Sequence, residues 1–327
     1  MSTDVPPWPP ALLDVLRPIQ HLLDDSSVTD ILLDGTERIL VDRVGAQREV
    51  LPSAFQRAAT LTALVRFLGE LDGAEETREH VTVRLPDGSR VHAIAHSCAH
   101  RGNGPWIAIR RFRRLHLDAD ALIKNGAIPA EEMARLQHAL VAERRNVIVS
   151  GETGSGKTTF AEVLLRSLPP SERLLIMQDI EEIVPPTKEH CWGSFRPGPN
   201  GYTGLLASLL RMQPDRIALG EVRGPEAWVL LEALTTGHSG GVTTLHARSP
   251  AGALRRLESM SLLHPHAPDG RAIRARIAEA ADVIVQVARH HHAGEISRSV
   301  VHIAVVDSVT PTGDIRLQTL WKRKRGT

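Results

Sequence analysis

The chain has 327 residues, of which 42% are hydrophobic and 24% are charged, and its formal net charge is +1. These are values of an ordinary globular protein, so they exclude wholesale disorder, and the length is sufficient for two domains. The near-zero charge and the aromatic content of 3% argue against a nucleic-acid groove built from a basic surface and stacking rings. We therefore expect a folded protein of two domains, and nothing in its composition calls for nucleic acid as a partner.

Cysteine content and hydrophobicity bear on the compartment. Cys98 and Cys191 are the only cysteines and lie far apart, so neither a disulfide framework nor a cysteine zinc site is supported. The first ten residues, MSTDVPPWPP, lack the basic and apolar regions of a secretory signal, and no run of about 18 apolar residues occurs. We expect a cytoplasmic protein that touches a membrane only peripherally.

The first part of the chain, residues 1–114, has the pattern of an α+β domain. After a proline-rich start, apolar residues recur at helical spacing over 11–24, where Pro18 is expected to kink or split the helix, giving one or two short helices. Alternating apolar and polar residues on both sides of Pro86-Asp87-Gly88 predict an antiparallel hairpin. The remaining expected elements are strands at 31–33, 39–41 and 106–109 and a helix over 54–71.

From residue 115 to 327, helical segments alternate with short, continuously apolar strands. This pattern is typical of a parallel sheet covered on both faces, and hence of an α/β domain. Later β-like runs are expected to add antiparallel strands at an edge, while His290-His291-His292 is predicted to lie in a loop. The expected strands are 147–149, 174–177, 217–219 and 242–245, followed by 283–287, 300–306 and 315–320.

The sequence VIVSGETGSGKTTF fits the phosphate-binding pattern G-x-x-x-x-G-K-[ST], with an apolar strand before it and a helix after it. Glycines at 151, 154 and 156 let backbone amides approach a triphosphate, and the helix N-terminus adds partial positive charge. Lys157 is expected to reach the β and γ phosphates, and the Thr158 hydroxyl to bind Mg²⁺. The predicted ATP-binding residues are Gly151, Glu152, Thr153, Gly154, Ser155, Gly156, Lys157, Thr158 and Thr159.

Polar residues follow three other strands of the predicted parallel sheet. Asp179 and Glu182 follow one strand, Glu221 ends another and His246 ends a third. Since parallel strands end at one edge, these groups are expected to converge on the phosphate loop, where a carboxylate can polarise water. Glu221 is the predicted water-activating carboxylate. Each residue also has a structural alternative: helix capping, pairing of Glu221 with Arg223, or a hydrogen-bonded core histidine.

Arginines cluster where the two predicted domains join. Arg110 and Arg111 begin the sequence RRFRR, from which a guanidinium could reach a nucleotide bound to its own or a neighbouring subunit. A solvated linker is the equally open alternative.

Four blocks give the chain a resemblance to the type II/IV secretion ATPase superfamily, especially its Tad/Flp-pilus branch, also called the CpaF or TadA family. The blocks are GETGSGKTT as Walker A, MQDIEE as the Asp box, RMQPDRIALGEVRGPEA as Walker B, and TGHSGGVTTLHA as the His box. VTDILLDG, IRRF and RAIRARIAEAADVIVQVAR also look like this branch.

The resemblance implies a RecA-like ATPase domain behind a smaller N-terminal domain, with ATP and Mg²⁺ bound between them. It implies a homohexameric ring at the inner face of the cytoplasmic membrane that drives integral-membrane platform proteins to assemble pilin or export protein. Glu221 would be the Walker B acid, which holds Mg²⁺ directly or through water. The other implied catalytic residues are Asp179 and Glu182 of the Asp box, His238 and His246 of the His box, and Arg110, Arg111 and Arg196.

One position departs from the family pattern. Gln178 stands where the Asp box usually begins with Glu, so a second water-polarising carboxylate is not accounted for. Three alternatives stay open: a conjugation ATPase that serves DNA transfer, a RecA-like nucleic-acid motor, and a nucleotide-binding scaffold with little hydrolysis.

Overall fold

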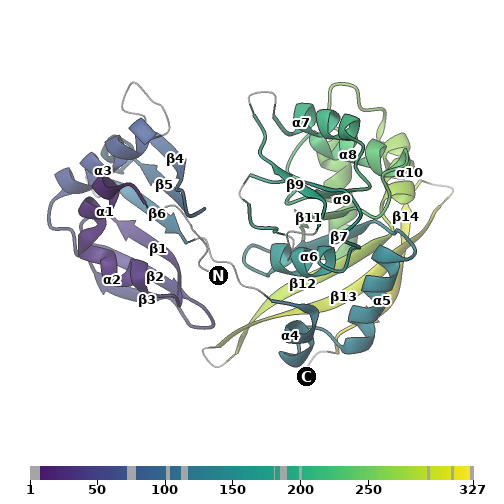
Figure 1. The fold of residues 1–327 in the computed structure, drawn as a ribbon, viewed down its shortest axis with the longest axis horizontal. Helices are drawn as coiled ribbons and strands as arrows, with labels where there is room; N and C mark the ends of the chain where they lie inside the picture. Colours follow the sequence, from purple (N-terminus) through teal and green to yellow (C-terminus); the bar gives the residue numbers. More distant parts are fainter. Residues whose placement is uncertain are drawn as a thin grey trace. The chain divides into compact units, whose positions relative to one another are not determined.

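The computed structural model describes residues 8–71, 79–100, 104–111, 117–179, 181–184, 190–198, 201–292, 295–310 and 313–324. The chain divides into two compact units (Figure 1). The first comprises residues 1–114 together with 291–296, and the second comprises 115–290 and 297–327. Among the described residues, no helix is long and apolar enough to cross a membrane.

The first unit is an antiparallel sheet with helices packed along it, in the order β3-β2-β1-β6-β5-β4. Its apolar core joins alternate strand residues to the helices. The predicted elements are present, although the helix expected from residue 54 begins at Ala58. At Pro18 a short 3-10 helix separates two α-helices. The strand β3 was not predicted. The elements are α1 (Pro10–Leu16), η1 (Arg17–Ile19), α2 (Gln20–Asp24), β1 (Val28–Asp34), β2 (Arg38–Arg43), β3 (Glu49–Pro52), α3 (Ala58–Leu71), β4 (His80–Arg84), β5 (Arg90–Ile94), η2 (His96–Cys98) and β6 (Trp106–Arg110).

The second unit contains an eight-stranded sheet in the order β14-β13-β12-β7-β11-β10-β8-β9. The strands from β12 across to β9 pair in parallel, and β13 pairs antiparallel with β14. This sheet confirms the predicted α/β fold. The strands are β7 (Val147–Gly151), β8 (Leu174–Met177), β9 (Trp192–Phe195), β10 (Arg216–Leu219), β11 (Val242–His246), β12 (Val283–His292), β13 (Glu295–Val309) and β14 (Ile315–Lys322).

Two predictions about this sheet were wrong. The strand β12 is not an antiparallel edge strand, because it pairs in parallel with β7 beside the phosphate loop. Residues 290–292, predicted as a loop, form the end of β12, since the strand continues past its apolar part into a polar extension. The strand β9 was also missed, because Trp192–Phe195 is too short and too mixed in polarity to give a strand pattern.

Helices cover both faces of the second sheet, and the side chains of β7 explain why (Figure 1). Val147 and Val149 belong to the core shared with one group of helices, whereas Ile148 belongs to the core on the other face. A strand with apolar residues on both faces must be covered twice. The first group is α4 (Ala119–Lys124), α5 (Ala130–Val141) and α6 (Lys157–Leu165); the second is α7 (Gly201–Leu209) with η4 (Leu210–Met212), α8 (Glu226–Thr235), α9 (Pro250–Ser261) and α10 (Gly270–Ala280).

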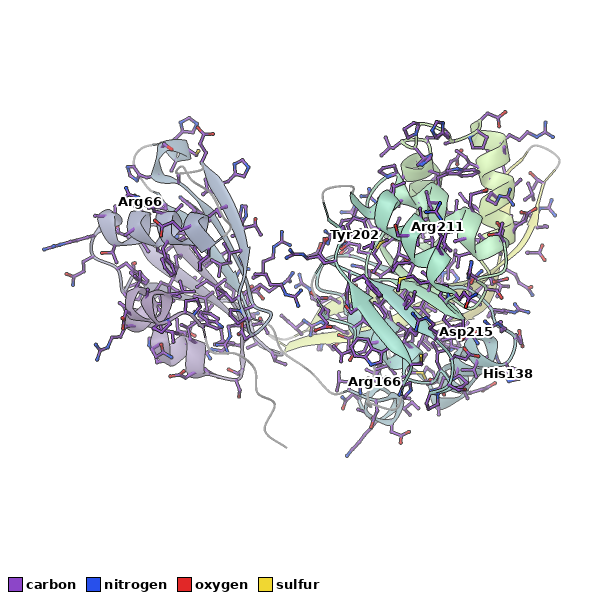
Figure 2. The ribbon with its side chains drawn as sticks, turned by 45° about the horizontal axis from the view of Figure 1, so that its top comes forward. Arg66, His138, Arg166, Tyr202, Arg211 and Asp215 are labelled. Atoms are coloured by element: carbon purple, nitrogen blue, oxygen red, sulfur yellow. The ribbon has the colours of Figure 1, made fainter. Side chains whose placement is uncertain are left out.

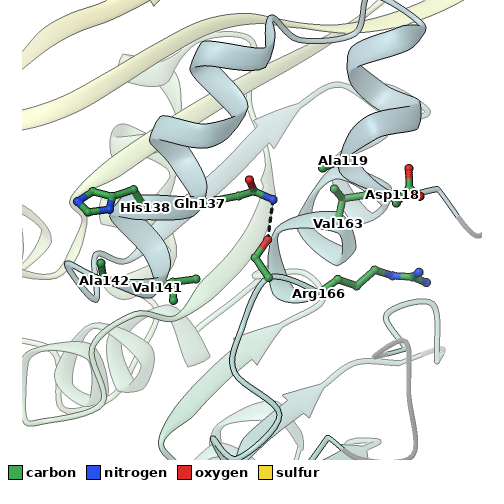
Figure 3. Close-up of a pocket in the computed structure, with 9 residues that line it drawn as sticks. Asp118, Ala119, Gln137, His138, Val141, Ala142, Val163 and Arg166 are labelled. Carbon is green, nitrogen blue, oxygen red and sulfur yellow. Dashed lines mark hydrogen bonds between the residues drawn. The ribbon is translucent and has the colours of Figure 1, made fainter.

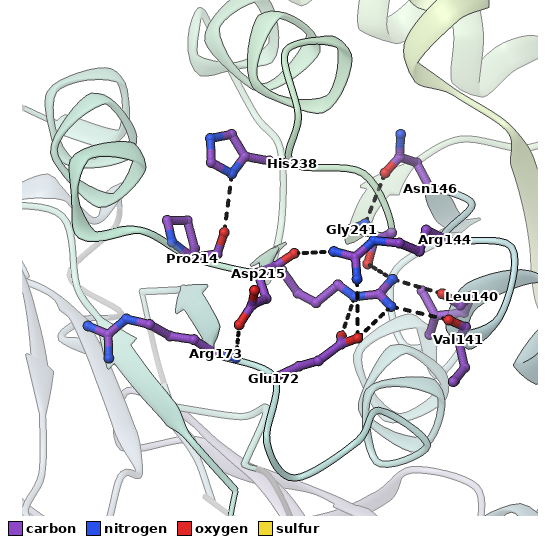
Figure 4. Close-up of polar contacts among 12 residues, drawn as sticks. Leu140, Val141, Arg144, Asn146, Glu172, Arg173, Pro214, Asp215, His238 and Gly241 are labelled. Carbon is purple, nitrogen blue, oxygen red and sulfur yellow. Dashed lines mark hydrogen bonds and ion pairs between the residues drawn. The ribbon is translucent and has the colours of Figure 1, made fainter.

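A buried arginine, Arg216, ties the amino ends of the strands to α5 through Glu172 and Leu140, two residues labelled in Figure 4. Arg216, which has 0% exposure, forms an ion pair of 2.5 Å from its Nε to Oε2 of Glu172. Its Nη1 also donates to the carbonyls of Leu140 and Gly240. Because a Cβ on Gly240 would stand 1.6 Å from Nη1, only glycine leaves room for this guanidinium.

Candidate functional site

The loop between β7 and α6 has the backbone of a phosphate cradle. Gly154 and Gly156 have φ angles of 72° and 92°, in the left-handed region that glycine adopts without strain. A Cβ on Gly151 would stand 2.4 Å from Oγ of Ser155 and 2.6 Å from the carbonyl oxygen of Val287, so this position requires glycine for space. The glycines thus serve two purposes, close packing at 151 and backbone shape at 154 and 156.

Lys157 is the first residue of α6, and its side chain folds back over the loop. It is only 7% exposed, and its Nζ donates to the carbonyl of Glu152 at 3.0 Å. Burial lowers its pKa from the ordinary value, while the nearby charges of Glu221 and Glu182 oppose that effect. The Oγ of Ser155 is buried without a hydrogen-bond partner in the described part of the chain. The loop therefore holds a buried cation and an unpaired hydroxyl, which suit an anionic, hydrogen-bonding ligand.

A chain of polar contacts runs from this loop across the carboxyl ends of β11 and β10. The Nζ of Lys157 lies 3.2 Å from Nδ1 of His246, and Nε2 of His246 lies 3.1 Å from Oε1 of Glu221. Since an ammonium can only donate, Nδ1 must accept, so Nε2 carries the proton and donates to Glu221. Burial and, next, Lys157 lower the pKa of His246, which favours this neutral form. Three of the predicted site residues are thus brought together.

Arg223 continues the chain to Asp179. Its Nη2 donates to Oε2 of Glu221 at 2.8 Å, and its Nη1 donates to Oδ2 of Asp179 at 2.5 Å. The hydrogen bond to Glu221 is the main cause that raises the pKa of Arg223. Burial and a hydrogen bond to Asp179 raise the pKa of Tyr202, which lies on α7 (Figure 2). Glu221 therefore makes both contacts at once, the pairing with Arg223 and the contact with His246.

Gln178 has a structural role in the loop after β8. It is 4% exposed, and its Oε1 accepts from the backbone amides of Glu182 and Ile183 at 3.1 and 2.9 Å. Its Nε2 donates to the carbonyl of Ile183 at 2.9 Å and to Oγ of Ser194 at 3.0 Å. A carboxylate could make only the accepting half of these bonds. The amide therefore fixes the segment that carries Glu182, whose own side chain is exposed.

His238 is not part of this cluster. It precedes β11, and its ring Nδ1 lies 3.3 Å from the carbonyl oxygen of Pro214, which precedes β10 (Figure 4). It therefore lies at the amino edge of the parallel strands, whereas Lys157 and His246 lie at the carboxyl edge. Within one subunit, the structure separates the two histidines of the His box by the length of a strand.

The predicted arginines have contacts of their own. In the first unit, the Nε of Arg110 lies 3.3 Å from Oδ1 of Asp30. Arg111 donates to the carbonyl of Leu23, and its guanidinium lies over the ring of Trp8. Arg196 is exposed just after β9. The rest of the RRFRR sequence lies outside the described residues.

A family model described as type II/IV secretion system protein matches residues 13–309. The chain belongs to this family. This secretion ATPase is 32% identical over 285 residues to the conjugal transfer protein TrbB of Rhizobium radiobacter, covering 86% of the chain and 85% of TrbB. It is 32% identical over 326 residues to a putative conjugal transfer protein of Mycobacterium tuberculosis, covering 94% and 88%. It is 28% identical to the protein VirB11 of Rhizobium radiobacter, covering 84% and 89%.

Solved structures confirm the fold of the secretion ATPase. The X-ray structure of the Legionella pneumophila ATPase DotB superposes with a TM-score of 0.62 at 20% identity, covering 93% of this chain and 84% of that one. The pilus retraction motor PilT with bound ADP gives a TM-score of 0.59 at 19% identity, covering 89% and 82%. The family match makes the chain a secretion ATPase, and these structures share the predicted α/β fold of its ATPase domain.

Two arginines beside the phosphate loop were not predicted. Arg289 lies on β12 and Arg298 on β13, and the Nε of Arg298 donates to the carbonyl of Gly154 at 2.8 Å. The strand pattern gave no signal for them: Arg289 ends a segment that was quoted only for its family resemblance, and Arg298 precedes an apolar run that indicates only a strand.

A cavity of about 510 Å³ lies elsewhere on the secretion ATPase (Figure 3). It is lined by residues at the start of α4, by residues on and just after α5, and by Val163, Arg166 and Ser167 at and just after the end of α6. Because the phosphate loop is at the start of α6, about two turns of helix separate the cavity from the predicted ATP site. The cavity therefore does not belong to that site.

Proposed function

We propose that the chain hydrolyses ATP at the carboxyl edge of the second sheet, with Lys157 and Glu221 as its two principal residues. The observation that carries this proposal is the contact chain from Lys157 through His246 to Glu221. It links a cation that binds phosphate to a carboxylate that can accept a proton. Such a link is what phosphoryl transfer to water requires, because the phosphate and the attacking water must be held together.

ATP binding is assigned to the loop from Gly151 to Thr159. Its backbone amides and the N-terminus of α6 would hold the phosphate oxygens, and Lys157 would exchange the carbonyl of Glu152 for them. Mg²⁺ fits this site, because the Thr158 hydroxyl is in the first turn of α6 and Glu221 follows β10 at the same carboxyl edge of the sheet. The ion needs few protein ligands, since phosphates and water complete its shell, and it would neutralise charge on the phosphates.

Glu221 is proposed to orient the attacking water and accept its proton. His246 donates to one carboxylate oxygen and Arg223 to the other, so the carboxylate is held in one orientation. Asp179 keeps Arg223 in place and is therefore a positioning residue in this proposal. The roles of Glu182, His238 and Arg196 stay predictions.

We further propose that the subunits form a homohexameric ring beneath a membrane apparatus, where they act on integral-membrane platform proteins. Arg110 and Arg111 of the first unit are candidates to complete the ATP site of the same or a neighbouring subunit. The family membership supports a secretion role. The sequence blocks favour the Tad/Flp-pilus branch, which assembles pili or exports protein.

A conjugation role is the second candidate. The names of relatives such as TrbB, a conjugal transfer protein, favour it. Purification of the chain with its membrane partners would separate the two: capture of pilin and platform proteins supports the pilus role, and capture of a DNA-transfer coupling protein supports conjugation.

The decisive test of ATP hydrolysis is Lys157→Ala. Loss of a preorganised electrostatic contact typically costs about 10²–10³ in turnover. Lys124→Ala, on an exposed lysine at the end of α4, is the matched control and should keep wild-type turnover. Equal turnover in the two variants would remove the loop from the mechanism.

The proposed ring is tested separately by the dependence of activity on protein concentration. Specific activity that rises with protein concentration would support the ring, and a monomer with constant specific activity would contradict it.

A further inference from the structure

We propose that Arg289 and Arg298 form an additional wall of the phosphate site: Arg298 positions the Gly154 peptide, and Arg289 binds phosphate oxygens. This inference rests on the proposed function, because it assigns residues to the same ATP site. Both arginines belong to the hairpin of β12 and β13 in the same chain, and they are distinct from Arg110 and Arg111.

Both side chains lie against the glycines that shape the loop. The Cδ of Arg298 is 3.3 Å from the position that a Cβ on Gly156 would occupy, and Nη1 of Arg289 is 3.3 Å from the corresponding position on Gly154. The Nε of Arg298 donates to the carbonyl of Gly154 at 2.8 Å. This bond fixes the orientation of the peptide that follows Gly154, whose amide is one of those that can face a phosphate.

The charges around the two arginines favour an anion. Neither has a carboxylate partner within the described ranges, in contrast to Arg223, which has two. Partial burial and, next, the charge of Arg289 lower the pKa of Arg298. Two like charges beside each other repel, and a phosphate chain would replace that repulsion with attraction. A guanidinium is suited to this role because its planar fork matches phosphate oxygens.

The hydrogen-bond donors of Arg298 and Arg289 are used differently. Arg298 uses its Nε on the loop, so its main effect is on the shape of the cradle. Arg289 has no such bond in the described structure, so its donors are available to phosphate oxygens. Loss of Arg289 should therefore weaken binding in proportion to phosphate charge, whereas loss of Arg298 should weaken binding and also lower turnover.

The test is the affinity of the full chain for ATP, ADP and AMP, measured by calorimetry with Mg²⁺ present, for wild type, Arg289→Ala, Arg298→Ala and Arg298→Lys. Arg316→Ala, on an exposed arginine of β14, is the matched control. A lost charge-assisted contact weakens binding by about tenfold or more. We expect that loss for ATP and ADP with Arg289→Ala, little change for AMP, and wild-type affinity with Arg316→Ala.

Arg298→Lys keeps the charge but not the Nε donor, so it should bind ATP better than Arg298→Ala and still show reduced turnover. Thermal unfolding of each variant checks that it is folded. If wild type binds ATP and Lys157→Ala loses turnover, but Arg289→Ala and Arg298→Ala both keep wild-type ATP affinity, the role of the two arginines is overturned and the proposed function stands. Failure of wild type to bind ATP would instead overturn the proposed function.

Discussion

Gln178→Glu tests whether the departure from the family's Asp box is a missing catalytic carboxylate or a structural requirement. The amide donates to the carbonyl of Ile183 at 2.9 Å and to Oγ of Ser194 at 3.0 Å. In the variant, a carboxylate oxygen would face the Ile183 carbonyl. The hydroxyl of Ser194 can turn to donate, but the carbonyl cannot. The substitution therefore leaves one buried acceptor without its donor.

An unsatisfied buried group costs about 1–3 kcal/mol. For a domain of 150–250 residues, this predicts a Tm lower by about 2–12 °C. Burial should also raise the pKa of the new carboxyl above its unfolded value. The loss of stability caused by this carboxyl is then absent at pH values below its pKa in the unfolded chain. It grows as the pH rises through its pKa in the folded chain, because the charged form is disfavoured in the folded state.

The assay is thermal unfolding between pH 4 and 8, with steady-state hydrolysis on the same preparation. Gln318→Glu, at an exposed position in the middle of β14, is the control for the added charge. We expect Gln178→Glu to have a lower Tm than this control at neutral pH, a smaller deficit at acid pH, and no gain in turnover. A wild-type Tm with faster hydrolysis would refute the structural reading and show that a carboxylate belongs at this position.

Two further predictions concern the same domain. Turnover should fall as the pH drops through the lowered pKa of His246, with an inflection below 6.5, because protonation removes the acceptor of the hydrogen bond from Lys157. An inflection above 6.5, or the same loss of turnover at acid pH in His246→Gln, would contradict this role of His246. Gly240→Ala should displace Arg216 and destabilise the chain by about 3–5 kcal/mol, the cost of breaking a buried pair. Gly126→Ala is the control, since Gly126 also has a positive φ but open space around it. An equal loss of unfolding free energy in the two variants, measured by denaturant unfolding, would contradict the role of Arg216.

The sequence predicted the site best where chemistry and strand pattern coincide. The phosphate loop combines an apolar strand, spaced glycines and a helix, and parallel strands must end together, so the meeting of Lys157, Glu221 and His246 could be inferred before any coordinates. The same reasoning could not place His238, because a histidine before a strand lies at the other edge. Its inclusion came from the family resemblance.

Other features depend on tertiary contacts that leave no local pattern. The parallel pairing of β12 with β7 is set by burial on both faces, which an apolar run alone does not reveal. Arg298 reaches the carbonyl of Gly154 across 144 positions of the chain, so no spacing rule could indicate it. Gln178 looked like a lost carboxylate in the sequence, whereas its four hydrogen bonds require an amide.

The catalytic role of Glu221 is tested most directly by the ATP affinity and turnover of Glu221→Gln, measured on one preparation beside Arg223→Gln. The first variant removes the proton acceptor, and its amide must also place a donor against either His246 or Arg223. The second keeps the carboxylate and its bond from His246. We expect Glu221→Gln still to bind ATP but to lose about 10²–10⁴ in turnover, as for loss of a general base, and Arg223→Gln to retain much more. Retained turnover in Glu221→Gln, or equal losses in the two variants, would contradict the central role of Glu221.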